Sequence, residues 1–140
     1  MSEADGAAVA PSAKRALVAG HADFATGLVS AVDLITGRGS ALVPIQVKGL
    51  CGDDIKQLLY DTMMTSGARV IFTDLQAGSC TMAARRVLRE LGEGTLVAGA
   101  NLPMLLDFAL SSDPDAAAAA TQAAERGRAA VSVHGVGGAT

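Results

Sequence analysis

The sequence is poor in aromatic residues and has no concentration of positive charge. Of its 140 residues only 3% are Phe, Tyr or Trp, and Trp is absent. The formal net charge is −3, and Lys and Arg do not gather into a long run. Domains that bind nucleic acids present a basic surface, and those that bind single strands add aromatic side chains that stack on the bases. The sequence therefore argues against a nucleic-acid partner.

Long apolar runs are also missing, and cysteine is scarce. No segment approaches the roughly 20 consecutive apolar residues of a membrane span. Residues 1–13 lack the positive start and apolar centre of a signal peptide, so we expect a disordered leader and a cytoplasmic protein. Cys51 and Cys80 do not have the spacing of metal ligands, and we expect two free thiols. We expect neither a metal ion nor another cofactor.

Aliphatic residues supply the material for a core. Half of the residues are hydrophobic, and 140 residues suffice for one domain. Short apolar runs that are typical of strands alternate with segments whose apolar residues recur at helical spacing. The predicted strands are residues 16–20, 41–47, 69–73 and 95–99. The alternation predicts one α/β domain over residues 14–134, with an open, mainly parallel sheet, flavodoxin-like layering and helices on both faces.

The predicted helices begin and end at recognisable residues. They span 22–36, 53–66 with Asp53 as the N-cap, and 79–91, and two more begin at Asn101-Leu102-Pro103 and at Asp113-Pro114. Pro44 has no N–H for a strand ladder and places the second strand at a sheet edge. Residues 129–134 favour one more short strand, antiparallel at an edge of its own sheet or of a partner's sheet. We expect residues 135–140 to form a flexible tail.

Polar residues follow two of the predicted strands. His21 comes directly after the first strand, and Asp74 after the third. Ligands of open α/β sheets bind outside the carboxyl ends of the strands, where neighbouring strands send their helices to opposite faces. If the first and third strands are neighbours, His21 and Asp74 meet at such a point.

These residue types suit phosphoryl transfer. A neutral imidazole offers one lone pair to an electrophile while its other nitrogen holds a proton. A carboxylate that accepts this proton selects the tautomer and stabilises the positive charge that develops on attack. Backbone N–H groups around Gly78 and Ser79, at the start of a helix, are placed to hold phosphate oxygens. We interpret His21 as a nucleophile that carries a phosphoryl group.

Each of these residues also has a plainer interpretation. His21 and Asp74 are both suited to cap helices in a purely structural interaction domain. A small-molecule-binding regulatory module with a flavodoxin-like sheet is a further alternative, although the chain has neither a Walker A loop nor a dinucleotide fingerprint. His134 lies in a glycine-rich tail, and we expect it to be solvated.

Three segments resemble the EIIA components of the mannose-fructose-sorbose family of the bacterial sugar phosphotransferase system. The first is 16–37, in which a strand ends in a histidine and the following helix ends at glycine. The second, Thr73-Asp74-Leu75-Gln76-Ala77-Gly78-Ser79, is similar to the family's Asp-x-x-Gly-Gly-Ser segment. The third, Gly99-Ala100-Asn101-Leu102-Pro103-Met104, is similar to its Gly-x-Asn-x-Pro-Met segment. The matches occur in the same order and with similar spacing.

The resemblance implies a phosphotransferase whose His21 accepts phosphate from phospho-HPr and passes it to a cognate EIIB. EIIB then phosphorylates sugar during uptake through the membrane subunits EIIC and EIID. Asp74 matches the aspartate beside the family's active histidine, and Gly78, Ser79 and Asn101 are implied to line the phosphate site. The resemblance also implies a homodimer in which a C-terminal strand, here 129–133, crosses to the partner.

The sequence departs from the family pattern at two positions. Ala77 replaces the first glycine of the usual pair, and Cys80 stands where many members have proline. The resulting segment, Ala77-Gly78-Ser79-Cys80-Thr81, is similar to the one in members linked to N-acetylgalactosamine or galactosamine. An EIIA-like phosphocarrier that serves dihydroxyacetone kinase is an alternative within the same chemistry.

Overall fold

The computed structural model describes residues 13–138. Nearly all of the leader expected at 1–13 lies outside the described residues, as do the last two residues of the expected tail. Among the described residues, none of the helices combines the length and the apolar character needed to cross a membrane.

Four short strands form one parallel sheet. They are β2 (Ala16–Ala19), β3 (Leu42–Ile45), β4 (Val70–Thr73) and β5 (Thr95–Ala98), and their order across the sheet is β3-β2-β4-β5. All three pairings are parallel, and their registers align the ends of the strands, so that Ala19 lies opposite both Ile45 and Thr73. The predicted parallel sheet is confirmed, and β3 with its Pro44 is an edge strand as expected. The carboxyl ends of the strands therefore lie together at one end of the sheet.

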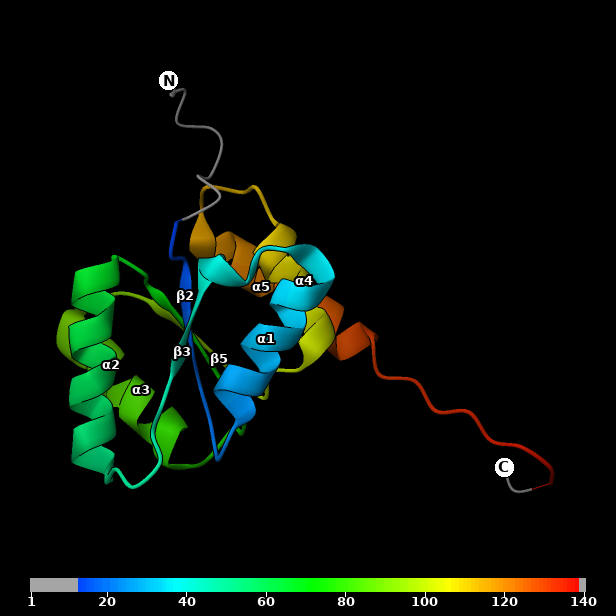
Figure 1. The fold of residues 1–140 in the computed structure, drawn as a ribbon, viewed down its shortest axis with the longest axis horizontal. Coiled ribbons are helices and arrows are strands. Elements are labelled where there is room, and N and C mark those ends of the chain that lie inside the picture. The colour runs from blue at the N-terminus through cyan, green and yellow to red at the C-terminus, as the bar shows by residue number, and fades with distance from the viewer. Residues whose placement is uncertain (1–12, 139–140) are drawn as a thin grey trace.

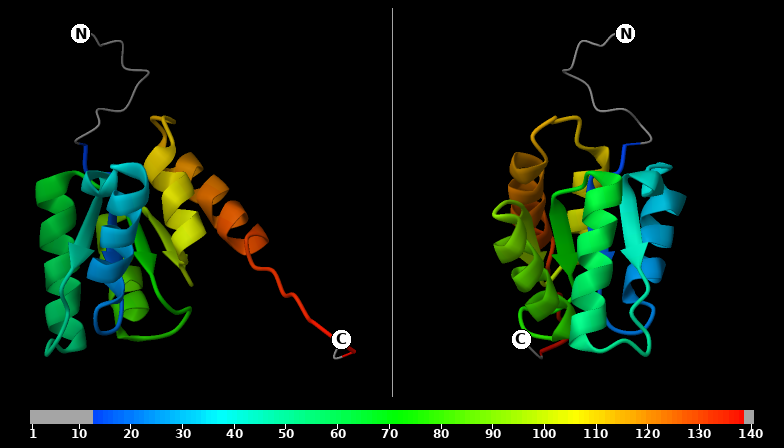
Figure 2. Two further views of the ribbon diagram at one scale, coloured as in Figure 1. Left: turned by 45° about the vertical axis from the view of Figure 1, so that its right-hand side comes forward. Right: turned by 90° about the vertical axis from the view of Figure 1, so that its left-hand side faces the viewer.

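Helices cover both faces of the sheet (Figures 1 and 2). On one face lie α1 (Phe24–Thr36), α4 (Leu102–Leu110) and α5 (Ala116–Ala129), and on the other lie α2 (Gly52–Ser66) and α3 (Ser79–Leu91). A short 3-10 turn, η1 (Gly39–Ala41), precedes β3. Successive side chains of a strand point to opposite faces. Val18 and Phe72 accordingly pack in the first layer, and Leu17 and Ile71 in the second.

The core is aliphatic, with one aromatic contact. The rings of Phe72 and Phe108 meet edge to face, with centroids 5.0 Å apart. Arg15 is 7% exposed, lies over the Phe108 ring and donates hydrogen bonds to the carbonyls of Ser111 and Asp113. Burial lowers the pKa of Arg15, and the charges of Asp113 and Asp115 oppose that shift. Arg15 thus joins the start of β2 to the α4–α5 connection, a contact that sequence periodicity does not indicate.

Two predicted helix caps are wrong. The second helix begins at Gly52 after Cys51, so Asp53 lies in its first turn, where a carboxylate is favoured by the helix dipole. The last helix is capped by Asp115, whose side chain accepts from the N–H groups of Ala117 and Ala118. Asp113 instead accepts from the Asp115 N–H in a turn that precedes the helix. The cap of α4 by Asn101 is confirmed, because its side chain accepts from the Met104 N–H at 3.1 Å.

The short strand expected at 129–134 is absent. Helix α5 continues to Ala129, and the segment after it has no regular structure within the described residues. The segment extends away from the body of the molecule (Figures 1 and 2), and Val131, Val133 and Val136 are 72%, 92% and 91% exposed. A strand needs a neighbour for its backbone hydrogen bonds, and none of the described strands pairs with this segment in the single chain. The exchange of a strand in a dimer is therefore not confirmed by the fold.

Candidate active site

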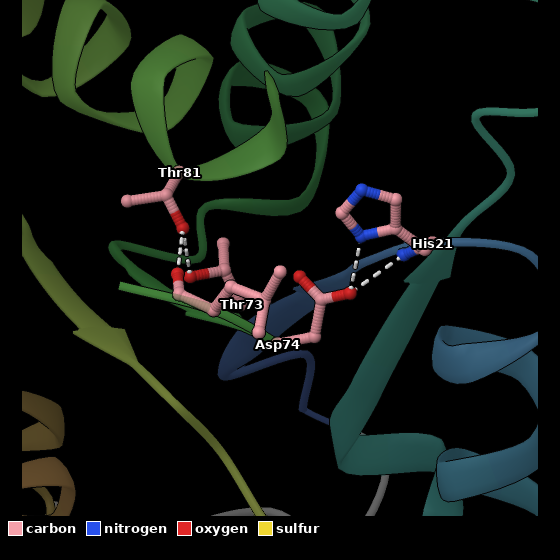
Figure 3. A network of polar contacts seen from close by, with 5 residues as sticks. His21, Thr73, Asp74 and Thr81 are labelled. Atoms are coloured by element: carbon pink, nitrogen blue, oxygen red, sulfur yellow. Dashed lines mark hydrogen bonds and ion pairs between the residues drawn. The ribbon is translucent and has the colours of Figure 1, made fainter. Parts of the chain in front are cut away.

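His21 and Asp74 meet at the carboxyl end of the sheet. Strands β2 and β4 are neighbours, and the helices that follow them, α1 and α3, lie on opposite faces. One carboxylate oxygen of Asp74, Oδ2, lies 2.7 Å from His21 Nδ1 and accepts from the His21 backbone N–H at 2.8 Å (Figure 3). The predicted juxtaposition of the two residues is confirmed.

The two side chains differ in their access to solvent. The Asp74 side chain is 12% exposed and that of His21 is 60% exposed. Burial raises the pKa of Asp74, but the hydrogen bonds from the backbone and ring of His21 outweigh it and hold the pKa below its ordinary value. Asp74 is therefore a carboxylate at neutral pH and accepts a proton from Nδ1. In the neutral ring the lone pair then belongs to Nε2, on the opposite side of the imidazole from Asp74.

The turn that carries His21 depends on the absence of a side chain at Gly20. A Cβ added at Gly20 would lie 2.5 Å from a ring carbon of Phe24 and 2.8 Å from Cγ of Asp74. The chain then passes through Ala22 with a φ of 49°, and the Phe24 N–H donates to the His21 carbonyl. The close approach of Asp74 to the backbone at residue 20 is what lets one carboxylate oxygen reach both nitrogens of His21.

Gly20→Ala is expected to lower the free energy of unfolding by about 1–3 kcal/mol, because the added methyl group displaces Phe24 and Asp74. Gly27→Ala in α1 is the matched control, since a Cβ there meets nothing within 4 Å. In an exposed helix interior this change is expected to stabilise by about 0.5–1 kcal/mol. Urea denaturation of both variants tests the difference, and equal stabilities would contradict the packing argument.

The loop after β4 brings the start of α3 to the histidine ring. Gly78 has a φ of 156°, which residues with side chains rarely adopt, and a Cβ at this position would lie 3.5 Å from His21 Cε1. Helix α3 begins at the next residue, Ser79. The first N–H groups of a helix have no carbonyl partner within the helix, and they favour an anion. Gly78 thus lies beside the His21 ring, and the phosphate-binding role of Gly78 and Ser79 stays a prediction.

Asn101 makes hydrogen bonds within the α4–α5 part of the molecule. Its side-chain oxygen accepts from the Met104 N–H, and its amide group donates to the Gly127 carbonyl at 3.0 Å. These bonds join the start of α4 to α5. Among the described residues no contact links Asn101 to His21, and its role in phosphate binding stays a prediction.

Three polar contacts near the site do not follow from the sequence pattern. Lys48, on the loop after β3, pairs with Asp23 at 2.8 Å. The hydroxyls of Thr73 and Thr81 are buried and lie 2.6 Å apart, and Thr81 also donates to the carbonyl of Leu75 (Figure 3). Thr81 stands among the polar residues of the loop and helix start in the sequence, but only the folded connection between β4 and α3 reveals its partners.

The cysteines are free thiols, as expected. Cys51 is exposed, and Cys80 is buried beside the site. Burial raises the pKa of the Cys80 thiol, and the negative charge of Asp74 raises it further. Within residues 13–138, no three His, Cys, Asp or Glu side chains are grouped in a way that would hold a metal ion.

Comparison with known families agrees with this geometry. The family profile EIIA-man, described as the fructose IIA component of the phosphotransferase system (PTS), matches residues 15–125. The chain belongs to the EIIA-man family. Membership makes it a IIA component of a sugar phosphotransferase system, and the family implies phosphotransfer with HPr and EIIB as partners. No curated protein sequence matches the chain significantly.

Solved structures show that the fold is that of the EIIA-man family. The mannose/sorbose-specific IIA subunit of Enterococcus faecalis superposes with a TM-score of 0.74 at 19% identity, over 91% of this chain and 99% of that one. An EIIA component from Streptococcus agalactiae gives 0.68 at 21% identity, over 81% and 93%. The IIA protein associated with a fucose utilization operon in Streptococcus pneumoniae gives 0.70 at 20% identity, over 89% and 96%.

Proposed function

We propose that this protein is a cytoplasmic phosphocarrier that accepts a phosphoryl group from phospho-HPr on His21 Nε2 and passes it to a cognate EIIB. EIIB in turn phosphorylates a sugar during uptake through EIIC and EIID. The observation that carries the proposal is the 2.7 Å contact between His21 Nδ1 and Asp74 on a ring that is 60% exposed. This contact leaves the second ring nitrogen available to a docked protein.

The transfer needs one bond made and one broken at phosphorus. The Nε2 lone pair of His21 attacks the phosphorus of the donor's phosphohistidine, and the donor imidazole leaves with the electrons of its P–N bond. The positive charge that forms on the His21 ring is stabilised by the Asp74 carboxylate, which keeps its hydrogen bond to Nδ1–H. In the second step a nucleophile of EIIB attacks the same phosphorus, and His21 returns to the neutral ring.

The start of α3 is the proposed cradle for the transferred group. Gly78 lies beside the ring, α3 begins at the next residue, and the dipole of this helix favours negative charge at its start. Phosphoryl transfer depends mainly on positioning and charge stabilisation, and the start of α3 supplies both. Asn101, whose amide joins α4 to α5, is proposed to line the phosphate site as well.

Labelling of the wild-type protein tests the proposal. Incubation with radiolabelled phosphoenolpyruvate, enzyme I and HPr is expected to give acid-labile phosphohistidine, and subsequent addition of EIIB to discharge it. Absence of label would reject the phosphocarrier and favour a regulatory module that binds a small molecule without covalent chemistry. Discharge to a dihydroxyacetone kinase subunit instead of a sugar EIIB would show that the protein serves that kinase. The sugar transported by the EIIB that does discharge the protein tests the assignment to the N-acetylgalactosamine branch.

We also propose a homodimer in which the C-terminal segment crosses to the partner. In the described part of the chain no strand lies beside the outer edge of β5, and exposed valines follow α5 at Val131 and Val133. A cavity of about 330 Å³ borders β5 and α5 and is lined in part by Val97 and Val131.

Sedimentation equilibrium is expected to show a dimer for the full chain and a monomer for a chain that ends at Ala130. The reason is that an unpaired sheet edge gains backbone hydrogen bonds from an added strand. A full-length monomer would contradict the proposal, and a dimer of the truncated chain would place the interface elsewhere.

A further inference from the structure

The buried threonine pair behind the active site forms a hydrogen-bond chain with a defined direction. Thr73 and Thr81 are 0% and 1% exposed, and their hydroxyl oxygens are 2.6 Å apart. Each hydroxyl has one proton to donate. The Leu75 carbonyl only accepts, so the proton of Thr81 goes to Leu75, and the proton of Thr73 goes to Thr81. The chain therefore runs from Thr73 to Thr81 to Leu75.

This chain holds the backbone on both sides of Asp74. Thr73 is the last residue of β4, and Leu75 is the first residue beyond Asp74. Both are bonded to the same hydroxyl of Thr81, in the first turn of α3 (Figure 3). The Thr73 carbonyl is held as well, because it accepts from the N–H groups of Gly99 and Ala100 at 2.9 Å. Asp74 thus projects from a backbone that is clamped before and after it.

Packing alone does not require hydroxyls at these positions. The other residues of β4, Val70, Ile71 and Phe72, are apolar and equally buried. Valine has nearly the shape of threonine, and a buried hydroxyl is costly unless it is hydrogen-bonded. The polar pair occurs at the point where β4 passes into the loop that carries Asp74 and Gly78. A displacement of about 1 Å at a reacting group costs about a hundredfold in rate, so positioning at this point matters.

We propose that Thr81, through its bonds to Thr73 and Leu75, is a positioning residue that aims the Asp74 carboxylate at His21 Nδ1 and so selects the tautomer with a free Nε2. Its effect on the transfer rate rests on the function proposed above. Its effect on the His21 ring does not, because the tautomer can be measured in the unphosphorylated protein.

The test compares Thr81→Val, Thr81→Ser and Thr73→Val in the full-length protein. Thr81→Val leaves the Thr73 hydroxyl without an acceptor and the Leu75 carbonyl without a donor. We expect it to slow phosphoryl acceptance by about tenfold to a hundredfold at saturating phospho-HPr. Thr81→Ser keeps the hydroxyl and is expected to stay within about threefold of the wild type. Thr73→Val removes only the donor to Thr81, so its loss is expected to be smaller than that of Thr81→Val.

Nitrogen-15 NMR of the His21 ring separates positioning from simple destabilisation. The wild type is expected to show a protonated Nδ1, and Thr81→Val a larger share of the Nε2–H tautomer. Thr121→Val, which removes an exposed threonine hydroxyl bonded to the Ala117 carbonyl in α5, is the matched control and is expected to change neither readout.

Three results would overturn the proposal. One is a Thr81→Val protein with wild-type rate and wild-type ring signals. Another is a Thr73→Val protein that loses as much activity as Thr81→Val, because this would contradict the direction of the chain. The third applies if Thr81→Val does not fold: it is a Thr73→Val protein whose His21 ring signals equal those of the wild type. A wild type that takes no label rejects the phosphocarrier function, while the ring signals still decide the positioning role.

Discussion

His21→Ala is expected to take no label from phospho-HPr, whereas His134→Ala is expected to be labelled like the wild type. The chain has only these two histidines, so the pair of variants assigns the phosphohistidine without further mapping. Both side chains are exposed, but only that of His21 is held by a carboxylate at the carboxyl end of the sheet. Loss of the imidazole removes the nucleophile, and no neighbouring group in the described site offers an equivalent lone pair.

The His21→Ala variant is expected to remain folded. The side chain is 60% exposed, and the backbone N–H of residue 21 keeps its bond to Asp74. We expect the free energy of unfolding to change by less than about 1 kcal/mol, measured by urea denaturation. A labelled His21→Ala protein would reject His21 as the carrier. His21→Gln extends the test to sugar uptake, which stays unchanged if His21 merely begins a helix in a structural domain.

Asp74→Asn is expected to slow phosphoryl acceptance by up to about ten-thousandfold, the loss seen when the carboxylate of a hydrolytic triad becomes an amide. The amide oxygen would remain with the His21 backbone N–H, which donates to Asp74 in the wild type. Because the same oxygen, Oδ2, accepts from both nitrogens in the wild type, the amide oxygen would also face Nδ1–H and would accept from it as a neutral and therefore weaker acceptor. The amide also carries no charge to stabilise the imidazolium.

The control for Asp74→Asn is Asp53→Asn, which removes an exposed carboxylate from the first turn of α2. Rapid-quench measurement of label transfer from phospho-HPr distinguishes the two variants. Equal rates for wild type and Asp74→Asn would remove Asp74 from the mechanism. A loss of rate in both would indicate a general effect of surface charge on docking.

The pH dependence of the stability of the wild type gives a second test of Asp74. Hydrogen bonds hold the pKa of Asp74 below its ordinary value, so its contribution to stability is complete above the unfolded-state pKa of about 4. That contribution is lost as the pH falls through the lower pKa of the folded state. Asp74→Asn is expected to lack this part of the acid destabilisation. Parallel loss in wild type and variant between pH 5 and pH 3 would contradict the assigned pKa direction.

Local patterns predicted the layers of the fold because strands and helices are encoded by short-range periodicity. The apolar runs at β2 and β4 and the helical spacing of α1 are each readable within about a dozen residues. The parallel arrangement followed from their alternation, and Pro44 correctly marked an edge. The family resemblance then connected His21 with Asp74 before their adjacency was known.

By itself, the sequence determined the order of the elements, the chemical types at the strand ends and the family. The tertiary structure decided which strands are neighbours, and with this the 2.7 Å contact between His21 and Asp74. It also assigned the Asn101 amide to the α4–α5 contact, joined Thr73 to Thr81, and left the expected last strand without a partner. These outcomes depend on how groups compete in three dimensions for the same hydrogen bonds and space, which no local pattern records.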